Sequence, residues 1–180
     1  MNLWHRVNPS DIKPEKFLAC IEIPQGSKNK YELDKYSGAL KLDRILYTST
    51  HYPHNYGFIP KTLADDGDAL DVLVISSEPI VPLALVDCRP IGLLEMIDGG
   101  SKDAKILAVA INDPVYNQIT NINQIYDHVL REIKHFFSVY KELEGKSTVI
   151  DKVDGPETAQ KIIQDCISAY NEKFGENYKD

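Results

Sequence analysis

The chain has 180 residues, of which 43% are hydrophobic and 26% charged, a composition typical of one soluble globular domain. Its 27 acidic and 20 basic residues give a formal charge of −7, which argues against a general nucleic-acid binder because such a protein needs a basic face. No apolar run approaches the ~20 residues of a membrane span, and the N-terminus lacks the apolar core of a signal peptide. Three widely spaced cysteines fit neither a disulfide framework nor a zinc site. We therefore expect one domain over residues 1–180, cytoplasmic, with reduced thiols and neither a nucleic-acid nor a membrane partner.

Short apolar segments with the periodicity of strands follow one another through the first two-thirds of the chain. In 17–23, Phe17, Ala19 and Ile21 share one face, which is the period-2 pattern of a β-strand. The other expected strands are 30–34, 39–47, 69–75, 86–97 and 104–111. Because clusters of Gly, Pro and Asp separate them, the pattern favours a small closed barrel over β-α-β units.

The periodicity changes to that of helices after residue 120. In 121–145, apolar residues recur at spacings of three and four, and Gly145 would end the helix. A second helix is expected over 155–175, with Pro156 and Glu157 in its first turn. The expected fold class is therefore α+β, mainly β: a small closed OB-like β-barrel flanked by two C-terminal helices.

Several charged residues lie in strands where apolar residues would be expected. Glu22 lies in 17–23 opposite the apolar face, and a solvent-facing glutamate explains it equally well. Lys30 and Glu32 share a strand face at a spacing of two and are readily explained as a surface pair. Arg44 lies between two leucines on one face, and a mostly buried arginine implies a paired acid or an anionic ligand.

Aromatic residues are dense in the segment HYPHNYGFIP at 51–60. Tyr52 and Tyr56 are separated by a turn that contains proline, and aromatic loops of this kind usually serve packing. Tyrosine hydroxyls are also neutral donors that can bind a phosphate oxygen without adding charge. Tyr140 and Lys141 close the long helix, where a cation is favourable in any case.

The stretch DDGDALDV at 65–72 concentrates four carboxylates before an apolar strand. A solvated acidic loop is its simplest explanation. A helix–loop–helix calcium loop fails, because its sixth position counted from Asp66 is Asp71 rather than Gly. A turn at Gly67 would instead let the carboxylates of Asp66, Asp68 and Asp71 converge. Hard oxygen ligands without His or Cys suit Mg²⁺ or Mn²⁺ rather than zinc.

A second acidic turn repeats this pattern in MIDGGSKDAKIL at 96–107. Asp98 and Asp103 flank a Gly-Gly pair, and Lys105 follows two residues later. Each of these features is weak by itself, but together they indicate a site that binds metal ions and phosphate.

Together, these motifs resemble those of the family I soluble inorganic pyrophosphatases, in their short bacterial form. The family signature D-[SGDN]-D-[PE]-[LIVMF]-D-[LIVMGAC] is similar to DGDALDV at 66–72, with Ala69 where Pro or Glu is usual. Further segments that resemble family motifs are KYE at 30–32, YPHNYG at 52–57, RPIG at 89–92, DAK at 103–105 and HFFSVYKEL at 135–143. The similarity extends over about residues 5–145. The family's K-x-V-x-V-x-G-W segment is not matched because KSTVIDKVDG has no Trp, which puts C-terminal packing in question rather than the chemistry.

The resemblance implies hydrolysis of inorganic diphosphate to two orthophosphates with Mg²⁺ as the cofactor, and with Mn²⁺ or Co²⁺ as substitutes. Candidate acids outnumber candidate cations in the implied site. Such a negatively charged cage recruits several divalent ions, and these ions in turn neutralise the phosphates.

The resemblance also implies a role for each candidate residue. The implied metal ligands are Asp66, Asp71, Asp98, Asp103 and Glu32, with Asp71 as the bridging carboxylate. Asp68 is the candidate general base. The implied phosphate-binding residues are Lys30, Arg44, Tyr56, Tyr140 and Lys141. Lys30, Arg44 and Lys105 are the implied catalytic cations, which offset charge on the phosphates, and Glu22 and Tyr52 are expected to support the site from behind.

Two other functions remain open at this point. An OB-fold nucleic-acid-binding module needs a basic, aromatic strand face, which the net charge opposes. A metal-dependent nucleotide phosphohydrolase would be expected to carry a P-loop or a base-stacking motif, and neither is visible. The histidines, among them His128 and His135, are expected to serve packing or subunit contacts, and a homohexamer is implied only by analogy with the short bacterial family members.

Overall fold

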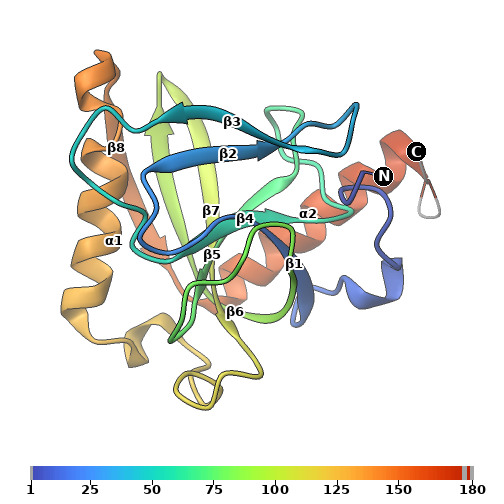
Figure 1. Ribbon diagram of the computed structural model, residues 1–180. Helices are drawn as coiled ribbons and strands as arrows, with labels where there is room; N and C mark the ends of the chain where they lie inside the picture. The colour runs from blue at the N-terminus through green and yellow to red at the C-terminus, as the bar shows by residue number, and fades with distance from the viewer. Residues whose placement is uncertain (1, 176–177, 179–180) are drawn as a thin grey trace.

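The computed structural model describes residues 2–175 and 178 (Figure 1). The strands of this part of the chain are β1 (Phe17–Ile23), β2 (Asn29–Leu33), β3 (Leu40–Ile45), β4 (Asn55–Ile59), β5 (Leu70–Ile75), β6 (Leu85–Asp98), β7 (Ser101–Ala110) and β8 (Thr148–Asp154). Its helices are α1 (Asp127–Val139) and α2 (Pro156–Phe174), and short 3-10 turns lie at Pro9–Asp11, Ile122–Gln124 and Glu142–Glu144.

Over these residues a six-stranded sheet has the order β1-β4-β5-β7-β6-β8. The first half of β6 also pairs with β1, so the strands from β1 to β6 in this order close into a ring. The second half of β6 pairs with β8, which extends the ring toward α1. The predicted fold, a small barrel-like sheet with two C-terminal helices, is confirmed.

The strands of the ring are apolar on both faces because each face packs against a different helix. In β5, Val72 and Val74 belong to a core cluster that includes Ile163 of α2. Leu73 of the same strand belongs to a second cluster with Phe136 of α1. A strand that is buried on both faces has a continuous apolar sequence, and this explains why LDVLVI was recognisable without alternation.

Strands β2 and β3 form a separate two-stranded ribbon that lies across the top of the barrel in Figure 1. A ribbon of two strands is marginally stable by itself, so its contacts with the barrel determine its position. One of these contacts is the hydrogen bond that the backbone N–H of Leu33 donates to Glu22 Oε1 at 2.7 Å.

The structure corrects three expectations about elements. The segment 51–60, expected as an aromatic loop, contains β4, and 148–154 forms β8 although the family's Trp is absent. The single helix expected over 121–145 is instead a 3-10 turn followed by α1, which starts only at Asp127. Gln124 causes this break: its side chain accepts hydrogen bonds from the backbone of Asn121 and Thr120, and the chain leaves the turn extended at Ile125.

Helix α2 is confirmed almost at its predicted bounds, and its C-terminal end packs on the N-terminal segment. The ring of Trp4 contacts Tyr170 and Phe174 edge-on, with centroids 6.3 and 5.6 Å away, and Figure 1 shows the end of α2 close to the N-terminal segment. All three cysteines are buried free thiols. Among the described residues, neither helix combines the length and the apolar character that crossing a bilayer requires.

Candidate active site

One face of the sheet changes from apolar to charged residues at the same level in two neighbouring strands. Leu73 and Asp71 share a face of β5, and Leu107 and Lys105 share the corresponding face of β7, because alternate residues of a strand point to the same side. β5 and β7 are parallel, and their register places Asp71 directly opposite Lys105. Asp103, two residues before Lys105, lies on the same face. The sheet therefore brings three charged side chains together at the end of an apolar core.

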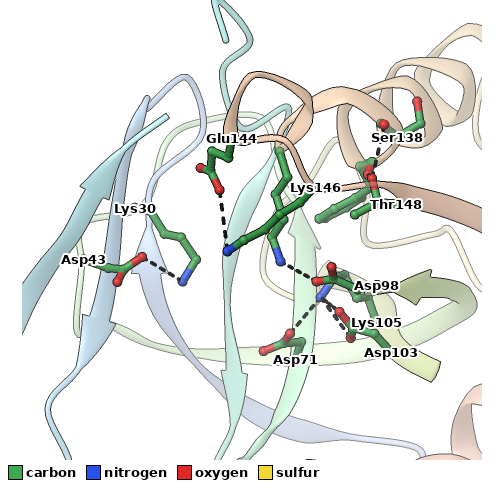
Figure 2. Close-up of polar contacts among 12 residues, drawn as sticks. Lys30, Asp43, Asp71, Asp98, Asp103, Lys105, Ser138, Glu144, Lys146 and Thr148 are labelled. Atoms are coloured by element: carbon green, nitrogen blue, oxygen red, sulfur yellow. Dashed lines mark hydrogen bonds and ion pairs between the residues drawn. The ribbon is translucent and has the colours of Figure 1, made fainter. Parts of the chain in front are cut away.

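The Lys105 ammonium group is the centre of this cluster (Figure 2). Its side chain is only 2% exposed, and its Nζ lies 2.8 Å from Asp71 Oδ2 and 3.0 Å from Asp103 Oδ2. The same Nζ donates to the hydroxyl of Tyr56 at 3.0 Å, and this hydroxyl in turn donates to Asp71 Oδ2 at 2.5 Å. A buried lysine is thus compensated by two carboxylates and one hydroxyl.

Burial and charge determine the protonation of these groups. Burial by itself would lower the pKa of Lys105, but the carboxylates of Asp71 and Asp103 outweigh it, so the pKa is raised and the ammonium form is retained. Burial raises the pKa of Asp103 in spite of Lys105. Burial, reinforced by Asp71, raises the pKa of Tyr56 well above its usual value, so Tyr56 acts as a neutral donor.

Glu22 is buried beside this cluster, so the solvent-facing explanation for it is wrong. Its carboxylate accepts the N–H of Leu33, which partly lowers its pKa. Burial is the larger effect, and together with the negative charge of Asp71 it raises the pKa of Glu22 to about 8. Glu22 therefore supports the ribbon from inside the barrel.

The segment that follows α1 contributes further groups to the site. Lys141 forms an ion pair with Asp98 at the end of β6, and Tyr140 beside it is 5% exposed. Burial lowers and the bond to Asp98 raises the pKa of Lys141, with a net rise. Thr148 secures the end of α1 that precedes this segment, because its hydroxyl donates to the carbonyl oxygen of Phe137 at 2.6 Å and to that of Ser138 at 3.1 Å; Figure 2 shows Thr148 beside Ser138.

The acidic turn lies at the rim of the site. Gly67 has a φ of +86°, the left-handed conformation that permits a tight turn there, and Asp66 accepts the N–H of Asp68 at 3.0 Å. Asp68 is exposed and forms an ion pair with Lys35 at 2.6 Å. The predicted turn at Gly67 is therefore present.

A cavity of about 480 Å³ is lined by groups from all these elements. The predicted site residues that line it are Glu22, Lys30, Glu32, Tyr56, Asp66, Asp68, Asp71, Asp98, Asp103, Lys105, Tyr140 and Lys141. Carboxylates that are far apart in the sequence thus face one space together with lysines and tyrosines.

Comparison with known proteins identifies the family. The family profile described as inorganic pyrophosphatase matches residues 19–171. Soluble inorganic pyrophosphatase 2 of Chlamydomonas reinhardtii is 49% identical over 172 residues, which are 95% of this chain and 89% of that protein. The inorganic pyrophosphatase of Geobacillus stearothermophilus is 50% identical over 155 residues, 86% of this chain and 94% of that protein. This chain belongs to the inorganic pyrophosphatase family.

Solved structures of pyrophosphatases support this assignment. The crystal structure of the Thermus thermophilus inorganic pyrophosphatase superposes with a TM-score of 0.91 at 41% identity, covering 95% of this chain and 99% of that one. The Helicobacter pylori inorganic pyrophosphatase superposes with a TM-score of 0.86 at 40% identity, covering 89% and 96%. The predicted family resemblance is confirmed in sequence and in fold.

Two of the residues predicted from pyrophosphatase motifs do not line the cavity. Tyr52 is buried behind it, with its ring centroid 5.3 Å from that of Tyr56. Arg44 is half-buried, and its guanidinium group binds two carboxylates: Nε lies 2.5 Å from Glu144 Oε1 and Nη1 lies 2.6 Å from Asp43 Oδ2. The paired acids that its placement in the strand implied are thus present.

The side chains that line the cavity include groups that can bind metal ions. Carboxylates are numerous in the lining of the cavity, and carboxylate oxygens are the ligands that Mg²⁺ prefers. Among the described residues, no three Asp, Glu, His or Cys side chains surround one point. Lysine ammonium groups lie between the carboxylates instead, as Lys105 does between Asp71 and Asp103. The spaces between the carboxylates thus hold the positive charge of lysine ammonium groups, which is consistent with sites that bind metal cations.

The sequence analysis missed several residues of this pyrophosphatase site. Trp4 and Lys35 line the cavity, with the Lys35 ammonium 4.8 Å from the Trp4 ring centroid, and neither was named as a candidate. Asp43 precedes Arg44 directly and could have been noticed as a candidate partner. Glu144 is 100 residues from Arg44, so no local pattern indicates their contact.

Proposed function

We propose that this protein is a Mg²⁺-dependent enzyme that hydrolyses inorganic diphosphate to two orthophosphates. One observation carries the proposal: Asp66, Asp71 and Asp103, which come from two separate acidic segments of the sequence, line the same cavity as the cations Lys30 and Lys141. A highly anionic substrate needs both groups, because the carboxylates gather divalent ions and the lysines bind phosphate oxygens. Membership of the pyrophosphatase family supports the same reaction.

The carboxylates of the cavity would hold the divalent ions. The proposed ligands are Asp66, Asp71, Asp98, Asp103 and Glu32, with Asp71 as the carboxylate that two ions would share. When bound, such ions neutralise phosphate charge and lower the pKa of an attacking water. Mg²⁺ is proposed as the natural ion, and Mn²⁺ or Co²⁺ as substitutes.

Asp68 is proposed as the general base. It lies on the exposed rim next to the other carboxylates, where water has access, and its Oδ1 atom is held by the N–H of Ala69 at 2.7 Å and by Lys35. An aspartate held in this way can accept the proton of a water that attacks phosphorus.

The cations and hydroxyls of the cavity would orient the two phosphates. Lys30, on the ribbon, and Lys141, after α1, come from different elements, both line the cavity, and they can bind different phosphate groups. Tyr56 and Tyr140 would add neutral donors, and Lys105 would offset charge that develops on the leaving phosphate. For Arg44 we propose a role in binding phosphate from the ribbon, although two carboxylates hold it in this structure.

We further propose a cytoplasmic homohexamer. Three buried free thiols are consistent with a reducing compartment. His128 and His135 are exposed on α1 and line a second surface cavity, where they are available for contacts between copies. Analytical ultracentrifugation tests the subunit number, and a mass equal to one chain would exclude it.

A phosphate-release assay tests the proposed reaction. With Mg²⁺, we expect fast release from diphosphate and release at least about 100-fold slower from ATP. Addition of EDTA should abolish it. Equal rates on both substrates would indicate a nucleotide phosphohydrolase instead. No release, together with salt-sensitive binding of single-stranded DNA, would indicate a nucleic-acid-binding module.

A further inference from the structure

The position of the β2–β3 ribbon decides whether the proposed site is complete. Lys30 and Glu32 line the cavity from β2, yet in the described part of the chain β3 pairs with β2 alone. The residues of β3 itself are exposed or half-buried, and the buried Leu46 anchors only the end of the strand. Polar contacts are therefore needed to fix the position of the rest of β3 against the molecule.

The contact between Arg44 and Glu144 meets this requirement. Arg44 belongs to β3, and Glu144 ends the 3-10 turn Glu142–Glu144 that follows α1. Arg44 Nε donates to Glu144 Oε1 at 2.5 Å, and the two side chains are only 23% and 8% exposed. Because this pair is shielded from solvent, it is worth more than a pair on the open surface.

This ion pair is connected to phosphate-binding residues on both sides. On the ribbon, the strand register places Arg44 opposite Lys30, and Asp43, which binds Arg44, lies 3.6 Å from Lys30 Nζ (Figure 2). On the other side, Glu144 follows Lys141 by one turn. The pair thus joins the two segments that carry Lys30 and Lys141.

We propose that Glu144 is a positioning residue: by binding Arg44 it docks the β2–β3 ribbon against the segment after α1 and so sets the separation of Lys30 and Lys141. Glu144 does not belong to the described residues that line the cavity, so it acts through Arg44 rather than on the substrate. This inference rests on the proposed function, since the two lysines are there assigned to phosphate binding.

The test variant is Glu144→Gln, which keeps the shape of the side chain and removes its charge. We expect its KM for magnesium diphosphate to rise about tenfold while kcat changes less than about threefold, because the lost interaction orients groups that bind substrate and transition state alike. Calorimetric titration with methylenediphosphonate, a diphosphate analogue that is not hydrolysed, should show about tenfold weaker binding. An unchanged KM together with unchanged analogue affinity would overturn the inference.

Two matched controls separate this role from a general loss of charge. Glu142→Gln changes the exposed glutamate at the start of the same 3-10 turn, for which the described residues show no ion pair. Lys146→Met removes the other cation near Glu144, which is 4.0 Å away and 61% exposed. Both variants should keep the wild-type KM. A tenfold rise in either one would contradict a specific role for the Arg44 contact.

A double-mutant cycle with Arg44→Met gives the readout that loss of stability alone would not produce. In the Arg44→Met background the contact is already absent, so Glu144→Gln should change KM less than about twofold. A further tenfold rise in that background would refute action through Arg44. If Glu144→Gln does not fold, Glu144→Asp, which keeps the charge but is one methylene shorter, replaces it under the same criteria. If the wild type hydrolyses no diphosphate, the proposed function fails, whereas the analogue affinities still decide whether Glu144 positions the ribbon.

Discussion

Asp71 is the residue at which stability and activity can be separated most clearly. Its Oδ2 atom accepts the Tyr56 hydroxyl at 2.5 Å and the Lys105 ammonium at 2.8 Å, and both donors are buried. Asp71→Ala removes this acceptor. Leaving the hydroxyl without one costs about 1–2 kcal/mol, and Lys105 loses one of its two carboxylates, which adds about 1–2 kcal/mol. Because Asp103 still pairs with Lys105 at 3.0 Å, we expect a loss of about 2–4 kcal/mol in unfolding free energy and a retained fold.

The expected loss of activity is much larger, because Asp71 is the proposed bridging ligand. We expect Mg²⁺-dependent kcat/KM to fall at least about 10³-fold, which corresponds to about 4 kcal/mol of transition-state stabilisation. Phosphate release measures it, and circular dichroism with urea titration measures the fold and its stability.

Asp71→Asn is the informative companion variant. An amide oxygen in the place of Oδ2 can still accept both hydrogen bonds, so this variant should lose less stability than Asp71→Ala while losing as much activity. The unfolding free energy would then depend on whether residue 71 can accept hydrogen bonds, and the activity would depend on whether it carries a negative charge. Activity of Asp71→Asn within tenfold of wild type, with an unchanged circular dichroism spectrum, would refute the bridging role.

Three further predictions concern other parts of the molecule. Asp68→Asn should lower kcat more than it lowers Mg²⁺ affinity in a calorimetric titration, and equal loss of both would make Asp68 a simple ligand. Burial lowers the pKa of His54 to about 4, below the ~6.5 of an unfolded chain. The unfolded chain therefore binds a proton at this histidine before the folded protein does, so the contribution of His54 to stability is complete above pH 6.5 and is lost as the pH falls toward 4. His54→Gln should therefore weaken the acid dependence of unfolding free energy by up to about 3 kcal/mol, measured by urea titration from pH 7.5 to 4.5, and identical slopes would exclude this effect. Gly57→Ala should abolish folding, because its Cβ would lie 1.9 Å from the carbonyl oxygen of Cys20, and a soluble variant with a wild-type spectrum would show that β1 and β4 can separate there.

Some features followed from short-range patterns alone. The apolar runs at 69–75 and 104–111 predicted two strands, and both are present as β5 and β7 within one or two residues, except that β7 starts earlier, at Ser101. The left-handed turn at Gly67 was predictable because a run of aspartates around one glycine favours it. Helix α2 was predictable because Pro156 is suited to a first turn and Gly175 to the position after a helix end.

Strand β4 shows where local patterns mislead. Its sequence NYGFI is short, contains a glycine and follows a proline-containing turn, so it was interpreted as a loop. Only pairing with β1 and β5 makes it a strand, and Gly57 is required because the backbone of β1 approaches it too closely for any side chain. Tertiary contacts thus override the local preference of this segment.

The sequence by itself determined which residue types are available to the site, and most of the carboxylates, lysines and tyrosines that it indicated do line one cavity. Only the tertiary structure decided how they are combined. The parallel register of β5 and β7 aligns Asp71 with Lys105, 34 residues apart, and the docking of the ribbon joins Arg44 to Glu144, 100 residues apart. The physical reason is that strand periodicity specifies which side of a strand a residue faces, whereas the partner of that residue depends on long-range register and packing, for which no local pattern exists.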